Sequence, residues 1–250
     1  MINIKPNPKF NDAQVIAHVK ETFSTNNEGL FSVDFSCHKL KNSTIKQLAT
    51  ILKNRQITEI NLSSMNLTDE GLASFEEALK TNQYLNKLDL SHNRITNNSA
   101  LIISNQISSH PQLITNLKFN HIGASGAETI ARTIVKSSNS EINFSNNLIG
   151  NQGAQKIADI LADRSGNVTS LVLFENGITD EGDRYLAKIV PPHIKIFHRI
   201  KSFSFSDFIQ QKPLFLLVLL IFPPLLLILP FMKFKQEIEG CDYPRRKLTY

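Results

Sequence analysis

The apolar positions of this chain return in a phrase of nearly constant length. The phrase is clearest from Leu85 to Ile95, where positions 1, 4, 6 and 11 are apolar and position 9 is Asn. Similar phrases start at residues 30, 57, 85, 112, 139 and 168, so consecutive starts lie 27 to 29 residues apart. Such an interval is typical of repeat proteins, in which each unit packs against its neighbours. We therefore count six units in residues 30–190.

Each unit combines two periods. At its start, apolar positions 4 and 6 alternate with polar neighbours, as in a short half-buried strand. Later the spacing becomes i, i+3, i+4, i+7, as in Ala154, Ile157, Ala158 and Leu161, which is one stripe of an amphipathic helix. The pattern predicts a strand, a turn and a helix in every unit, and thus an α/β fold.

The recurring LxxLxLxxNxI phrase resembles the leucine-rich repeat of the long, ribonuclease-inhibitor-like class. The resemblance covers about residues 30–190 and implies a solenoid of six strand-turn-helix units, with a curved parallel sheet on its concave face. Some positions depart from the family pattern. His38 and Met65 stand where Asn is expected, Thr115 replaces a strand leucine, and Asp183 occupies a normally small apolar helix position. These single positions leave the predicted fold class unchanged.

The segments on either side of the repeats have predicted structures of their own. Residues 1–29 are expected to form an N-terminal cap, because Val15, Ile16, Val19 and Phe23 have helical spacing and an open solenoid end would expose apolar surface. An amphipathic targeting helix is the alternative for this segment. After the repeats, residues 191–212 are predicted to contain a closing strand and a linker.

A strongly apolar stretch, residues 213–232, contains no charged, amide or hydroxyl side chain. At about 1.5 Å per residue, a helix of this length just crosses a hydrocarbon layer of about 30 Å. We therefore predict a membrane segment, followed by a polar tail in residues 233–250. Two successive prolines interrupt any helix there, which leaves a kinked span and a re-entrant wedge as alternatives. The residues expected to contact lipid are Leu214, Phe215, Leu217, Leu220, Phe222, Pro223, Pro224, Leu227, Leu229 and Phe231.

The net positive charge of the chain comes from its C-terminal part. Residues 191–250 hold nine Lys or Arg and four Asp or Glu, which leaves 27 − 9 = 18 basic and 22 − 4 = 18 acidic residues in the first 190. Nucleic-acid binding would require a basic surface on the folded repeats. The electrically neutral repeats therefore argue against a nucleic-acid partner.

Strand side chains on the concave face are predicted to form a continuous, polar and mildly acidic surface. We predict that this surface binds a protein partner, as the resemblance to leucine-rich repeats implies, with the aromatic Phe174 as an anchor. A solvated face without a partner is the alternative. The predicted partner-binding residues are Asp34, Glu59, Asn61, Lys87, Asp89, Asn116, Lys118, Asn143 and Phe174.

The Asn at position 9 is predicted to be structural. Asn93, Asn120, Asn147 and Asn176 should point inward and hydrogen-bond the backbone of adjoining turns, which would hold the units in register. A ligand-binding role is the alternative interpretation of these four side chains.

The sequence contains no pattern that predicts catalysis, a metal site or a cofactor. Its seven His lack metal-ligand spacing, and neither an HExxH motif, a CxxC pair nor a glycine-rich phosphate loop occurs. Cys37 and His38 are adjacent, but chain neighbours rarely meet as nucleophile and base. We therefore expect no enzymatic activity, no cofactor and no small-molecule substrate.

These features together predict a membrane-tethered protein-interaction module, with its repeats in a cytosol, its protein partner on the concave face and membrane lipid around residues 213–232. Confinement to a membrane would raise the effective concentration of a partner in the same membrane. One alternative is a translocated effector of an intracellular bacterium that binds a host protein at a host membrane, since short proteins of this appearance resemble such effectors. Another alternative is an enzyme with an unrecognised site.

Overall fold

The computed structural model describes residues 1–26, 29–137, 141–163, 168, 170–191 and 194–197. All of these belong to the first of two compact units, residues 1–200. The predicted membrane segment, residues 213–232, and the polar tail lie outside the described residues. Within the described part of the chain, no helix is both long enough and apolar enough to cross a membrane.

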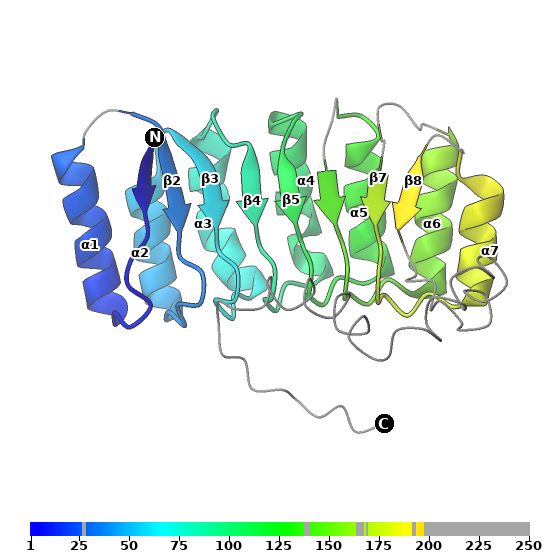
Figure 1. Ribbon diagram of the computed structural model, residues 1–250, viewed down its shortest axis with the longest axis horizontal. Helices are drawn as coiled ribbons and strands as arrows, with labels where there is room; N and C mark the ends of the chain where they lie inside the picture. The colour runs from blue at the N-terminus through cyan, green and yellow to red at the C-terminus, as the bar shows by residue number, and fades with distance from the viewer. Residues whose placement is uncertain (27–28, 138–140, 164–167, 169, 192–193, 198–250) are drawn as a thin grey trace, which may run out of the picture. The chain divides into compact units, whose positions relative to one another are not determined.

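Strands and helices alternate along the described chain (Figure 1). The strands are β1 (Ile2–Ile4), β2 (Phe31–Asp34), β3 (Ile57–Asn61), β4 (Lys87–Asp89), β5 (Ile114–Asn116), β6 (Glu141–Asn143), β7 (Ser170–Val172) and β8 (Lys195–Phe197). The helices are α1 (Asp12–Thr25), α2 (Asn42–Leu52), α3 (Asp69–Thr81), the 3₁₀ turn η1 (Asn97–Ser99), α4 (Ala100–Ser109), α5 (Ala124–Ile134), α6 (Gly150–Asp163) and α7 (Asp180–Ile189).

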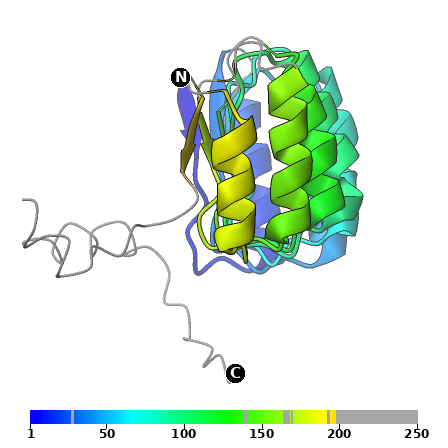
Figure 2. The ribbon, with the colours of Figure 1, turned by 90° about the vertical axis from the view of Figure 1, so that its right-hand side faces the viewer.

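The eight described strands form one parallel sheet in chain order, β1 to β8. Figure 2 shows the sheet as one layer with the helices on the same side of it. Strand residues such as Val33, Ile60 and Leu88 point to the helices and are buried. The parallel sheet, with a helix after each of the strands β1 to β7, confirms the predicted α/β solenoid. We call the side of the sheet opposite the helices the open face, which corresponds to the predicted concave face.

The N-terminal segment contains one element that the repeat phrase does not predict. Helix α1 starts after Asn11, whose side chain and that of Gln14 bond each other's backbone N–H at 3.0 and 2.9 Å. Before it, strand β1 pairs with β2, with Ile2 opposite Phe31. The N-terminal segment is therefore itself a strand and a helix, but it lacks the full phrase.

Groups at several helix starts donate hydrogen bonds to side chains of the preceding unit. The carboxylate of Asp69 in α3 accepts from the backbone N–H of Thr96 at 2.9 Å and from the hydroxyls of Thr96 and Ser99. In the next unit, Asn97 Oδ1 accepts from the N–H of Gly126 at 3.1 Å, where a Cβ would lie 2.5 Å from that oxygen. Two further residues cap the following helix in this way: Asp12 and Asn151. Such caps satisfy N–H groups that a helix start leaves without partners.

Thr115, the residue that departs from the strand leucine pattern, points into the core. It is 1% exposed, and among the described residues its hydroxyl has no hydrogen-bond partner. A buried hydroxyl without a partner destabilises a fold. The departure therefore weakens the core locally without changing the strand.

Candidate protein-binding surface

The open face presents side chains in two columns, because neighbouring strands pair in register at these positions; a register shift between Phe31 and Ser32 in the β2–β3 pair precedes them. The first column runs through Asn3, Ser32, Glu59, Lys87, Ile114 and the backbone position of Glu141. The second runs through Asp34, Asn61, Asp89, Asn116, Asn143 and Val172. The structure thus brings the predicted partner-binding residues of the strands together on one face. Lys118 and Phe174 follow two residues after the second column.

The Asp and Asn of the second column have a structural role that the sequence analysis missed. Their Oδ1 atoms accept a hydrogen bond from the backbone N–H two residues further on, at 2.9 to 3.2 Å. Asp and Asn form this turn equally well. The turn therefore requires one of these two residue types but does not require a charged side chain. The acceptors are Asp34, Asn61, Asp89, Asn116 and Asn143.

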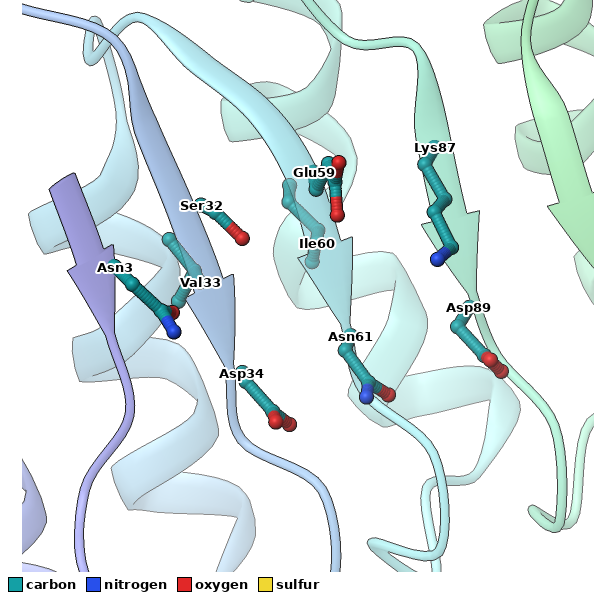
Figure 3. A pocket seen from close by; sticks show the side chains of 9 residues that line it. All are labelled: Asn3, Ser32, Val33, Asp34, Glu59, Ile60, Asn61, Lys87 and Asp89. Atoms are coloured by element: carbon teal, nitrogen blue, oxygen red, sulfur yellow. The ribbon is translucent and has the colours of Figure 1, made fainter. Parts of the chain in front are cut away.

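A shallow hollow of about 270 Å³ lies on the open face over β1 to β4. Figure 3 shows Asp34, Asn61 and Asp89 in one row across it, with Ser32, Glu59 and Lys87 in a second row. The hollow offers carboxylates and one ammonium group to a ligand.

An ion pair from the N-terminal segment makes this end of the open face less acidic than predicted. Lys5 Nζ lies 2.8 Å from Asp34 Oδ2. Burial would raise the pKa of Asp34, but hydrogen bonds from Lys5 and Ser36 outweigh it and the pKa lies below its ordinary value. The negative charge of Asp34 is therefore balanced by the ammonium group of Lys5.

Two aromatic rings lie at the ends of β4 and β5, and the sequence analysis did not select them. Phe119 stacks on His92 with ring centroids 4.3 Å apart and an interplanar angle of 23°. The ammonium of Lys118 lies 5.1 Å from the centroid of the Phe119 ring. Burial and the charge of Lys118 lower the pKa of His92, and Asp89 opposes this shift. The pair therefore presents a neutral aromatic surface beside a cation.

Apolar side chains occur at two further places on the open face. Phe174, the predicted anchor, lies with its ring centroid 6.4 Å from that of Phe197 in β8. Ile114 in the first column is 46% exposed, and the sequence analysis passed over it. The open face is thus polar with apolar points in its middle and at its C-terminal end.

The four Asn at position 9 are buried and bond backbone groups of adjacent units. Asn120 is representative: its Nδ2 donates to Leu90 O at 2.9 Å and Leu117 O at 3.1 Å, and its Oδ1 accepts from Ile95 N at 3.0 Å. His38 replaces Asn in the first unit, where its ring nitrogens lie 3.0 to 3.1 Å from backbone oxygens. The other members with equivalent bonds are Asn93, Asn147 and Asn176.

The ring of His38 has a structural role, and no metal-holding cluster occurs among the described residues. His38, the neighbour of Cys37, is 3% exposed and its ring nitrogens face main-chain carbonyls. It is therefore not placed as a base for Cys37. No group of three or more His, Cys, Asp or Glu within these residues is arranged to hold a metal ion.

Three stretches of the chain match a family model described as Leucine Rich repeat, at residues 81–101, 116–131 and 165–187. These matches support the assignment of leucine-rich repeats to this chain. The matched stretches fall mainly in the third, fourth and sixth units of our count.

A curated relative supports the same identification of these leucine-rich repeats. The mouse protein NACHT, LRR and PYD domains-containing protein 5 is 24% identical over 196 residues, which cover 76% of this chain. The match spans 17% of that protein, so the chain corresponds to a small part of its length. Neither this relative nor the family match supports a bacterial effector or a membrane segment, which stay predictions.

Two solved structures are also similar to the chain. One is a tropomodulin C-terminal domain from Caenorhabditis elegans, 16% identical, with a TM-score of 0.46 over 58% of this chain and 90% of that chain. The other is Leiomodin-1 Actin-Binding Site 2, 21% identical, with a TM-score of 0.46 over 69% of this chain and 91% of that chain.

Proposed function

We propose that these leucine-rich repeats form a protein-binding module that holds a protein partner against the open face. The observation that carries the proposal is the uncovered side of the eight-stranded sheet, whose side chains stand in two aligned columns. All helices of the described residues lie on the other side (Figure 2). An exposed sheet face of this extent, with polar side chains around apolar points, matches the composition of protein interfaces.

The rigidity of the face supports the proposal. Its strands are tied to a continuous core, and the turns that follow them are closed by the Asp and Asn side chains described above. A surface that is already ordered loses little conformational entropy when a partner docks. The polar columns therefore contribute specificity, while Ile114, Phe119 and Phe174 supply apolar contact area.

The first column offers a clean test, because neither Glu59 nor Ile114 closes a turn. In the double variant Glu59→Arg and Ile114→Arg, proximity labelling in cells should lose the partner proteins that the unaltered chain labels. The matched control is Ala73→Arg with Glu76→Arg on the exposed side of α3, which changes the charge by the same amount. The control should keep the partners. Equal labelling by both variants would contradict the open face as the binding surface.

We also propose that residues 213–232 tether the module to a membrane. The support is the sequence: an apolar stretch without charged, amide or hydroxyl side chains, flanked by Lys212 and Lys233. Lysine stems of this kind reach from an apolar layer to the headgroups. Deletion of all residues after Gln210 should move the protein from the membrane pellet to the soluble fraction. A deletion variant that stays in the pellet would contradict the tether.

A further inference from the structure

One position of every repeat has left-handed backbone geometry. It is the eighth residue of the phrase, just after the strand, and its φ lies between 54° and 65° in residues that are not glycine. Most L-residues avoid this region because Cβ approaches the following carbonyl, whereas Asn tolerates it best after Gly. A ring at this position is therefore costly. The six residues are Cys37, Ser64, His92, Phe119, Asn146 and Glu175.

Hydrogen bonds between the units impose this geometry on whatever residue is present. The N–H of His92 donates to Lys118 O at 2.8 Å, and the N–H of Phe119 donates to Ser145 O at 2.9 Å. Asn146, one unit further on, donates to Phe174 O at 2.7 Å with the same left-handed φ. An Asn at position 119 would therefore fit the turn with less strain than the phenylalanine that is there.

Burial does not compensate for the strain at Phe119. The core phenylalanines Phe35, Phe75 and Phe144 are fully buried, but Phe119 is 40% exposed and contacts His92 and Lys118 at the surface. A strained residue that adds little to the core is characteristic of a functional position. The left-handed geometry of Phe119 thus has a cost in stability that the packing of its ring in the core does not offset.

The charges around the two rings indicate which chemical group of a partner would bind there. No described carboxylate lies within ion-pair distance of Lys118 or of Lys87, on the adjacent strand. The nearby Asp89 is engaged through Oδ2 by Asn116 Nδ2 at 3.1 Å and through Oδ1 by Ser91 N at 2.9 Å. The surroundings of the aromatic pair therefore complement an apolar group that carries a negative charge beside it.

We infer that Phe119 and His92 are the anchoring point of the open face, and that they take an aromatic or aliphatic side chain from an extended segment of the partner protein with a carboxylate next to it. The rings supply a flat apolar contact, and Lys118 pairs with the carboxylate. This inference rests on the proposed function and names the partner chemistry that the surface selects. It places the anchor in the middle of the sheet rather than at Phe174.

The test uses a phage library of random 12-residue peptides panned on the full chain, followed by titration calorimetry with synthetic copies of the enriched peptides. Peptides with Phe or Leu beside Asp or Glu should be enriched. The variant Phe119→Asn should weaken their binding at least tenfold without lowering the melting temperature, because Asn suits the left-handed turn. The matched control Glu175→Asn alters the same repeat position two units away and should leave binding unchanged.

A second measurement tests the carboxylate. Replacing the peptide's Asp by Asn should weaken binding to the unaltered chain but should have no further effect on the variant Lys118→Gln. Enriched peptides that bind Phe119→Asn as tightly as the unaltered chain would overturn the anchor. If such peptides no longer bind the double variant Glu59→Arg with Ile114→Arg, the open face remains the binding surface and the proposed function survives. If they bind both this double variant and Phe119→Asn as tightly as the unaltered chain, the proposed function fails as well. A library without enriched peptides would overturn the anchor for extended segments.

Discussion

Replacement of Asn120 by Ala tests whether the buried Asn ladder holds the repeats together. The hydrogen bonds of the Asn120 side chain do not all contribute equally to the stability of the fold. Leu90 O also receives Nδ2 of Asn93 at 2.9 Å, and Leu117 O also receives Nδ2 of Asn147 at 2.9 Å, so each carbonyl keeps one donor. Only the N–H of Ile95 loses the acceptor that the structure shows for it.

The magnitude follows from this difference. Two shared hydrogen bonds contribute about 1 kcal/mol each, and an orphaned buried N–H costs about 1–3 kcal/mol. We therefore expect Asn120→Ala to lower the free energy of unfolding by about 3–5 kcal/mol. The measurement is urea unfolding followed by circular dichroism, with the unaltered chain and the variant under the same conditions.

Asn116→Ala is the matched control, because Asn116 lies in the same unit but on the open face. Its side chain accepts from Lys118 N at 3.2 Å and donates to Asp89, and it is only partly buried. We expect a loss of about 1 kcal/mol for this variant. Equal losses for the two variants, or a loss below about 1 kcal/mol for Asn120→Ala, would refute the ladder as the main link between units and reopen the ligand-binding interpretation.

Three further predictions concern single side chains. Thr115→Val should raise the free energy of unfolding by up to about 1 kcal/mol because it removes a buried hydroxyl without a partner, and a lower urea midpoint would contradict this. Burial raises the pKa of Asp69, but hydrogen bonds from Ser99 and Thr96 lower it more, so the net pKa lies below its ordinary value of 3.8. The stabilisation that Asp69 contributes is thus complete above a pH of 3.8 and is lost as the pH falls through the folded pKa. The difference in unfolding free energy between the unaltered chain and Asp69→Ala should therefore become smaller in acid. A difference that does not change with pH would contradict this role of Asp69. Asp34→Asn should keep its turn and its fold while releasing Lys5, so a large drop in melting temperature would show that the ion pair matters more than the turn.

The repeat interval made the sheet predictable. Because each unit returns after 27 to 29 residues, the residues of the second column could be aligned from the sequence, and the structure pairs Asp89 with Asn116 and Asn116 with Asn143 as that alignment requires. Apolar periodicity likewise indicated which side of each helix is buried. These features depend on regular spacing, which a single sequence displays.

Other features depend on contacts that spacing does not encode. Lys5 neutralises Asp34 from a segment outside the repeats. The turn-closing role of the Asp and Asn column becomes visible only with the backbone in place, although the recurrence of Asp or Asn two residues before Ser was a signal. The direction of Phe119 follows from a left-handed φ of 56°, which an aromatic residue does not suggest.

The helix caps that cross from one unit to the next all act in the same direction. Asp12, Asp69, Asn97 and Asn151 each support the helix start that follows them in the chain, and the helices at Gly123 and Thr179 have no cap from those residues' own side chains. Cohesion in this protein is therefore directional. Trimming units from the C-terminal side leaves the caps of α2, α4, α5 and α7 in place wherever these helices remain, whereas trimming from the N-terminal side removes the cap when one of them becomes the first helix; α3 begins at its own cap, Thr68. Shortened versions of the array should tolerate the first kind of cut better than the second.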